Sequence, residues 1–335
     1  MAALPKLLVS SVVRGSQQGD SHGGLYLVDM QRGVSDQVLD WNASGISWDG
    51  RGADRGLRGI AILGQEIFIA AADELFVYNQ QFRPITSYRN PYLSHCHELS
   101  VHQGKLYITS TGFDALLRME LATRQFDLGL KISNDAGAYN VRAFDPRQPG
   151  QATASNTLHI NSVHADNTGV FFSGRNVPAL VQITRNAIGP VAGLPRGTHN
   201  AQPFRGGVLF NDTESDALVW SGPAKRVAIP VPRYDPASLT HTDADQTKIA
   251  RQAFGRGLCV LSDTLVAAGS SPPLSRCTIL AQAHASPRTP SAWTSATPPT
   301  ALRYGRSKAA PSKQAAWPNK SLRKVATPAG ARPAS

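Results

Sequence analysis

Three histidines and a glutamate lie close together in the segment SHCHELSVHQGKLYITS, residues 94–110. His97 and Glu98 form the first half of the His-Glu-x-x-His signature that zinc proteases carry on a helix. That signature needs its two histidines four residues apart, so that both face one side of the helix. Here the next histidine, His102, is five residues after His97, and the KLYITS that follows is rich in β-branched and aromatic residues. The spacing therefore rejects a metalloprotease helix and predicts that these histidines lie at the two ends of a short strand.

This segment belongs to an internal repeat. HELSVH at 97–102 has a counterpart in HINSVH at 159–164, and each is followed by a turn and an apolar strand pattern. A third copy begins at His199, and two more carry arginine at the same point, at Arg58 and Arg256. The copies start 39, 62, 40 and 57 residues apart. A base period near 40 fits four short strands per unit with longer loops in two places, which is typical of a β-propeller.

The repeat predicts an all-β fold, a six-bladed β-propeller over residues 1–273. The N-terminal patterns KLLVSSVVR, GGLYLVDM and DQVLDW match strands two to four of a blade that lacks its first strand. We therefore expect the first blade to take a strand from elsewhere in the chain. Five or seven blades are compatible with the same spacing. A sandwich or a barrel is the competing architecture, but neither explains a polar residue that recurs at the same point of five successive units.

Charge divides the chain into a nearly neutral body and a basic C-terminal segment. Residues 264–335 hold ten of the 34 lysines and arginines and no Asp or Glu, so residues 1–263 carry 24 basic against 23 acidic residues. Residues 274–335 are rich in Ala, Pro, Ser and Arg and lack clear alternation, so we expect a disordered or frame-shifted tail. A basic arm that touches nucleic acid or acidic membranes and a plain solvated linker are the alternatives for this tail. The body gives no reason to expect nucleic-acid binding.

Several common classes are excluded by what the sequence lacks. The three cysteines, Cys96, Cys259 and Cys277, are too few for a disulfide framework and favour a reducing, cytoplasmic location. No stretch approaches the roughly 18 apolar residues of a membrane-spanning helix, so we expect no transmembrane segment. The sequence has no Gly-x-Ser-x-Gly elbow, phosphate loop or dinucleotide fingerprint. We therefore expect none of the hydrolases, kinases or dehydrogenases that these motifs mark.

The repeated polar residues define the candidate site. In a propeller the first strand of each blade lines the central channel, so the residues that begin these strands should form a ring around one mouth. The ends of the second strands reach the same mouth, and a rigid scaffold commonly carries its function where such positions converge. The expected ligand-binding residues are Arg58, His97, His159, His199, Arg256, Arg175, Asp212 and Glu214.

Three hypotheses follow for the ring. Arginines can hold a carboxylate or sulfate through two parallel contacts, so the main expectation is a ligand-binding funnel for a small anionic or saccharide ligand. Alternatively, His97, His159 and His199 could bind a divalent metal ion, the cofactor of a metal-assisted lyase or hydrolase. The third hypothesis is a protein-interaction scaffold that uses the outer rim. Channel-lining polar residues also often serve only to hydrogen-bond neighbouring blades, so the sequence leaves open whether the protein is an enzyme.

The segments HELSVHQGKLYITSTG, GLPRGTHNAQPFRGGVLFNDTESDALVW and FGRGLCVLSDTLVAAGSSP resemble an uncharacterised bacterial six-bladed β-propeller family, known as conserved hypothetical proteins. The resemblance covers about residues 5–273. More distantly, the layout resembles the gluconolactonase and strictosidine-synthase-like propeller superfamily, whose members typically hold calcium with Glu, Asn and Asp. The present chain has His and Arg at the corresponding ring. The resemblance therefore implies the fold and does not imply calcium-dependent hydrolase chemistry.

Overall fold

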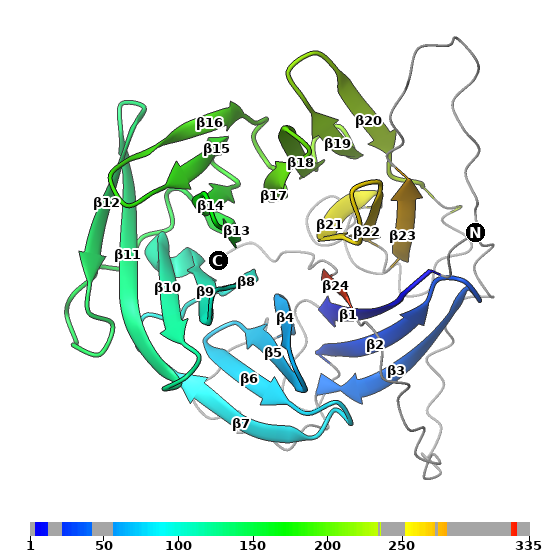
Figure 1. Cartoon of the computed structure of the whole chain (residues 1–335), viewed down its shortest axis with the longest axis horizontal. Helices are drawn as coiled ribbons and strands as arrows, with labels where there is room; N and C mark the ends of the chain where they lie inside the picture. The colour runs from blue at the N-terminus through cyan, green and yellow to red at the C-terminus, as the bar shows by residue number, and fades with distance from the viewer. Residues whose placement is uncertain are drawn as a thin grey trace.

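The chain folds into β-sheets arranged around a central axis (Figure 1). The computed structural model describes residues 4–12, 22–41, 56–233, 235, 252–271, 274–279 and 323–326. Regular structure in this part of the chain is almost entirely β-strand, and a short 3-10 turn, η2 (Thr111–Phe113), follows β9. Most sheets consist of consecutive antiparallel strands, the arrangement of propeller blades. The predicted all-β propeller is therefore confirmed.

The first half of the chain supplies most strands of three sheets. The sheet around the N-terminal strand has the order β24-β1-β2-β3, with β24 (Arg323–Ala326), β1 (Lys6–Val12), β2 (Gly23–Asp29) and β3 (Val34–Asp40). The next sheet contains β4 (Ile60–Leu63), β5 (Glu66–Ala71), β6 (Glu74–Tyr78) and β7 (Pro84–Arg89). The third contains β8 (Leu99–His102), β9 (Lys105–Ser110), β10 (Ala115–Glu120), β11 (Gln125–Asp135) and β12 (Ala138–Phe144).

The second half of the chain forms the remaining sheets. One contains β13 (Ile160–Asp166), β14 (Gly169–Gly174), β15 (Val177–Ile183) and β16 (Ile188–Gly193). The next contains β17 (His199–Phe204), β18 (Gly207–Asp212), β19 (Ala217–Ser221) and β20 (Arg226–Pro230). The last contains β21 (Phe254–Val260), β22 (Leu265–Ser271) and β23 (Leu274–Ile279).

The number of complete blades differs from the expected six. Among the described residues, five sheets have four or more strands, whereas the sheet of β21, β22 and β23 has three. Complete blades therefore number five, which is one fewer than the six expected and matches the alternative count of five. The difference falls where the sequence loses its alternation, after residue 271.

The first sheet obtains its innermost strand from the C-terminal segment. β24 pairs in parallel with β1, from Leu7 opposite Arg323 to Ser10 opposite Ala326, and it also contacts β4 and β21. This closes the ring with a strand from a distant part of the chain, as the incomplete first blade suggested. The other residues beyond 279 lie outside the described part of the chain, so the boundary at 273/274 and the nature of the tail stay predictions.

Apolar side chains between neighbouring sheets hold the ring together. Side chains alternate along a strand, so consecutive residues of β5 face different blades. Phe68 packs in a cluster with Leu106 of the following blade, whereas Ile67 packs in a cluster with Leu25 of the preceding one. All four side chains are at most 1% exposed, and each contributes about 1.5–3 kcal/mol by burial. This packing fixes neighbouring blades against one another and so positions the ring residues.

Candidate functional site

The five repeated residues lie where the first strands begin. Arg58 precedes β4, His97 precedes β8, His159 precedes β13, His199 opens β17 and Arg256 lies in β21. Each of these strands is the first strand of its sheet along the chain. The structure thus places all five at equivalent points of successive sheets, as the repeat predicts.

The backbone has the same irregularity at this point in three sheets. A register shift interrupts the pairing of β13, β17 and β21 with the strands that follow them, and such bulges re-aim side chains. Positive φ angles occur here at His159 (52°), Asn200 (55°) and Gly257 (73°). Asparagine and glycine tolerate this conformation best, which explains their place after the ring residue. The shifts lie between Ile160 and Ser162, His199 and Gln202, and Arg256 and Leu258.

Arg58 and His97 form a direct contact across two blades. Arg58 Nη1 lies 2.7 Å from His97 Nε2, and the guanidinium can only donate. His97 Nε2 must therefore accept, which places the ring proton on Nδ1, where the backbone oxygen of His95 lies within hydrogen-bond distance. Thr111 Oγ1 also lies 2.8 Å from Nδ1. His97 is thus a neutral acceptor that holds the 7% exposed Arg58 in place.

His159 stands next to His97 in the ring. The two imidazole centroids are 5.5 Å apart with an edge-on arrangement. His159 Nδ1 lies 3.0 Å from Asn156 Oδ1, an acceptor, so the lone pair of the neutral ring is on Nε2. The backbone N–H of His159 donates to Asp114 Oδ1 at 3.0 Å. Asp114 is fully buried and therefore fixes the backbone from which His159 projects.

His199 is the most buried histidine of the ring, with 3% of its surface exposed. Its Nδ1 donates to the backbone oxygen of Gly197 at 2.8 Å. Its Nε2 is buried and has no hydrogen-bond partner among the residues that the structure describes. Phe254 packs against it with a centroid separation of 5.9 Å, and Arg256 Cζ lies 4.6 Å from the centroid of the same phenyl ring. The phenyl ring therefore supports the imidazole and the guanidinium together.

Burial and neighbouring arginines keep all three histidines uncharged. Burial lowers the pKa of His159 to about 4, with further lowering by Arg256, Arg175 and Arg58. The pKa of His97 is lowered well below its usual value by burial and then by Arg58. The pKa of His199 is lowered well below its usual value by burial and then by Arg256. At neutral pH the charge of the ring comes from arginine, and the histidines offer lone pairs.

The residues expected from the second strands differ in their surroundings. Arg175, just after β14, is exposed and joins the ring, since its N–H donates to His159 O at 3.1 Å and its oxygen accepts from the N–H of Gly197 at 2.9 Å. Asp212 is 4% exposed and accepts from the backbone N–H of Glu214 at 3.2 Å, so it caps its own turn. Glu214 is exposed at the tip of this turn. The structure therefore brings Arg175 to the ring and gives Asp212 a structural role.

The expected metal ligands His97, His159 and His199 do not form a ligand group. No cluster of three or more His, Cys, Asp or Glu side chains suited to a metal ion occurs among the described residues. The physical reason is the contact of His97 Nε2 with Arg58, which engages the lone pair and places a positive charge beside it. A cation would meet several guanidinium groups at this mouth.

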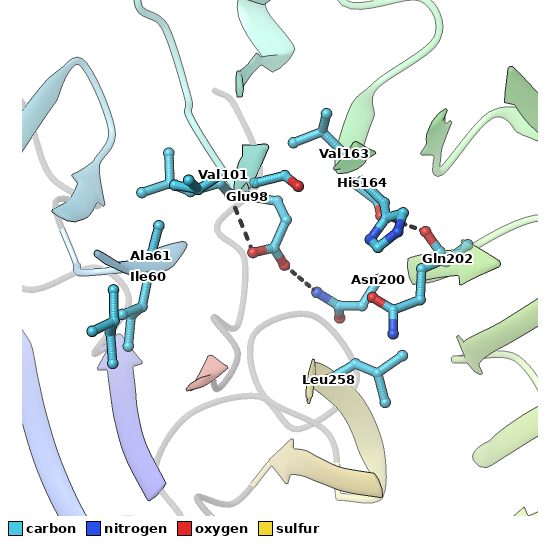
Figure 2. A pocket seen from close by; sticks show the side chains of 14 residues that line it. Ile60, Ala61, Glu98, Val101, Val163, His164, Asn200, Gln202 and Leu258 are labelled. Atoms are coloured by element: carbon cyan, nitrogen blue, oxygen red, sulfur yellow. Dashed lines mark hydrogen bonds between the residues drawn. The ribbon is translucent and has the colours of Figure 1, made fainter. Parts of the chain in front are cut away.

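A cavity of about 250 Å³ lies between the first strands (Figure 2). It is lined by residues of β4, β8, β13, β17 and β21 and of the short segments before them. Glu98 is 6% exposed and lies in this cavity, where its Oε2 accepts from Asn200 Nδ2 at 2.7 Å (Figure 2). Asn200 Oδ1 in turn accepts from the N–H of Gly257 at 2.8 Å. A polar network thus joins three blades beside this cavity, whose lining also includes the polar side chains of Ser100, Ser162, His164 and Gln202.

Sequence reasoning gave no role to Glu98, Asn200 or Asp114. Glu98 and Asn200 each follow a ring histidine directly, and this shared position is a signal that the repeat alignment contained. Asp114 lies in a turn with a φ of 43°, and its partners begin 41 residues later. No local pattern marks a contact of that separation.

No helix in the described residues is long and apolar enough to cross a membrane.

Comparisons with known proteins find distant similarity in structure and none in sequence. No family model matches the chain, and no curated protein matches it. A solved structure of a catalytically inactive virginiamycin B lyase from Staphylococcus aureus with quinupristin is 11% identical, covering 68% of this chain and 70% of that one, with a TM-score of 0.39. A chain of the mitotic checkpoint complex is 9% identical over 82% of this chain and 86% of that one, with a TM-score of 0.48.

The Pan2 WD40 domain of Neurospora crassa is 9% identical over 79% of this chain and 85% of that one, with a TM-score of 0.38. Likeness at this level does not assign an activity. The sheet topology itself makes the chain a β-propeller.

Proposed function

We propose that the protein binds a small organic anion, such as an acidic saccharide derivative, at the Arg/His ring. The observation that carries this proposal is the convergence of Arg58, Arg175 and Arg256 on the same histidines. All three arginines lower the pKa of His159, so their charges act on the same imidazole. An anion at the ring would be attracted by each of these charges.

The ring is preorganised for such a ligand. His97 holds the guanidinium of Arg58 at one side, and Phe254 supports that of Arg256 at the other. A planar guanidinium fits a carboxylate or sulfate through two parallel hydrogen bonds. Because Arg58 is nearly buried, its attraction for an anion is screened less than that of a surface arginine.

The direct test is titration calorimetry with succinate at low salt and pH 7.5. We expect saturable binding by the wild-type protein and a loss of about tenfold or more in affinity for Arg256→Gln. Arg185→Gln is the matched control, since Arg185 is exposed in the turn between β15 and β16. Absence of binding by the wild-type protein, or equal affinity in Arg256→Gln, would show that the ring is no anion site.

We also propose that the propeller has six blades. We take the three-stranded sheet of β21, β22 and β23 as the sixth blade, because its first strand supplies Arg256 to the ring. The kinship to a bacterial propeller family and a cytoplasmic location stay predictions from the sequence. So do a reaction that follows binding and a partner protein on the outer rim.

A further inference from the structure

We propose that the cavity between the first strands is a second binding site, and that its ligand is a small neutral polyol. This site is separate from the anion site proposed above, because none of the residues of the Arg/His ring lines the cavity. The residues that do line it determine the kind of molecule that it can hold.

A second repeated position supplies polar side chains to the cavity. Ser100, Ser162 and Gln202 each follow a ring histidine by three residues, in β8, β13 and β17. All three line the cavity. Their side chains carry no charge, whereas the ring contains arginines. Three consecutive sheets therefore present hydroxyl and amide groups to this space.

Gln202 offers both kinds of hydrogen-bonding group to a ligand. Its amide end points into the cavity (Figure 2). The side chain makes no hydrogen bond to any residue that the structure describes. An amide has two N–H donors and an oxygen that accepts. A ligand that satisfies Gln202 therefore has both an acceptor and a donor.

The two serines add a donor and an acceptor to this set. Ser100 Oγ accepts from the N–H of Ala165 at 3.0 Å, and its hydroxyl proton has no acceptor in the described part of the chain. Ser162 Oγ donates to the backbone oxygen of Ala201 at 3.0 Å and keeps lone pairs that can accept. A ligand that matches this lining donates and accepts hydrogen bonds at several points, as a series of hydroxyl groups does.

Glu98 makes the cavity unsuited to an anion. It is the only Asp, Glu, Lys or Arg among the described residues that line the cavity. Its oxygens accept from Asn200 Nδ2 at 2.7 Å and from the N–H of Leu99 at 3.2 Å. A second carboxylate in the same confined space would be repelled. The ligand class proposed for the ring is therefore not the class that fits here.

The remaining lining and the size of the cavity narrow the ligand further. Most of the other lining residues are aliphatic, such as Ile60, Val163 and Leu258, and they can pack against the C–H groups of a ligand. A wholly apolar ligand would cover Gln202 and Ser100 without giving them partners, which costs free energy. The volume of about 250 Å³ is below the range of about 300–1,000 Å³ that is typical of sites for drug-sized ligands. A short neutral polyol meets all of these conditions.

The test is a titration of the full-length protein with xylitol at pH 7.5, followed through the side-chain amide resonances of Gln202 in ¹H–¹⁵N spectra. These resonances are identified by their absence from the spectrum of Gln202→Leu. We expect saturable shifts with a dissociation constant of about 1 mM or less. 1,5-Pentanediol has the same five carbons without the three inner hydroxyl groups. It should bind about tenfold or more weakly, because it leaves polar groups of the cavity unpaired.

Variants of Gln202 test the assigned contact by calorimetry. Gln202→Leu should weaken xylitol binding about tenfold, because the amide is lost. Gln202→Glu keeps the shape of the side chain and removes its N–H donors, so it should also weaken xylitol binding even if the leucine variant folds poorly. Gln125→Leu is the matched control, since Gln125 is exposed at the start of β11, and it should leave the affinity unchanged.

The outcomes separate this site from the anion site. Absence of saturable shifts with xylitol would show that the cavity holds water only and would refute the proposal. Equal affinities for xylitol and 1,5-pentanediol would overturn the polyol assignment, and unchanged xylitol affinity in both Gln202 variants would overturn the site. Saturating succinate should leave the affinity for xylitol unchanged, and competition between the two compounds would contradict a separate site. Succinate binding by itself tests the ring, so each proposal can fail without the other.

Discussion

Replacement of Asp114 should destabilise the protein strongly and displace His159 from the ring. Asp114 is fully buried in the turn after η2 and accepts five hydrogen bonds from the segment that leads to β13. Three come from the backbone N–H groups of Thr157, Leu158 and His159, at 2.8, 3.2 and 3.0 Å. The side chain therefore clamps the connection between two blades.

The magnitude follows from these donors. In Asp114→Ala three buried backbone N–H groups lose their acceptor, and each unsatisfied group costs about 1–3 kcal/mol. Alanine is also disfavoured at the φ of 43° by about 1 kcal/mol. Allowing for relaxation of the segment, we expect a loss of about 4–5 kcal/mol in the free energy of unfolding. Asp114→Asn keeps the shape and tolerates this φ, but it loses the charge and one acceptor, so we expect about 2–3 kcal/mol.

Urea unfolding followed by tryptophan fluorescence measures both values, and the order Ala above Asn is part of the prediction. Asp145→Asn is the control, because Asp145 pairs with Arg147 at the surface, and this replacement should change the free energy of unfolding less than either replacement of Asp114 does. Succinate affinity of the folded Asp114→Asn protein should also fall, because His159 loses its backbone anchor. A change below about 0.5 kcal/mol in Asp114→Asn would refute the clamp.

Two further predictions concern pH and backbone packing. The pKa of His159 falls from 6.5 in the unfolded chain to about 4 in the fold, so the unfolded state binds more protons between these values and stability rises with pH across this window. The shift corresponds to on the order of 3 kcal/mol in the free energy of unfolding, which is present above pH 6.5 and lost toward pH 4. His159→Gln should therefore flatten the dependence of the urea midpoint on pH. Parallel curves for the wild-type protein and the variant would contradict this prediction. Gly59→Ala should lower the free energy of unfolding by about 1–3 kcal/mol. An added Cβ would lie 2.8 Å from Glu98 Cα and 2.8 Å from the backbone nitrogen of Leu99, and both atoms belong to the neighbouring blade. Gly189→Ala is its control, because no atom lies within 4 Å of that Cβ, and equal thermal midpoints of the two variants would disprove the close approach.

The sequence by itself determined the propeller and the positions of the ring residues. Each blade is a local meander, so a period of about 40 residues and the alternation within it specify the strands without long-range information. Arg58, His97, His159, His199 and Arg256 occupy one point of that period, and equivalent points of successive blades must face the same mouth.

Tertiary structure alone decided what these residues contact. Three contacts depend on how the blades meet. His97 accepts a hydrogen bond from Arg58, Glu98 accepts one from Asn200 across 102 residues, and Asp114 anchors the backbone of His159. Contacts between blades are set by closure of the ring and by bulges that re-aim single side chains, and neither leaves a periodic trace in the sequence. The same holds for β24, whose pairing with β1 depends on where the ring must close.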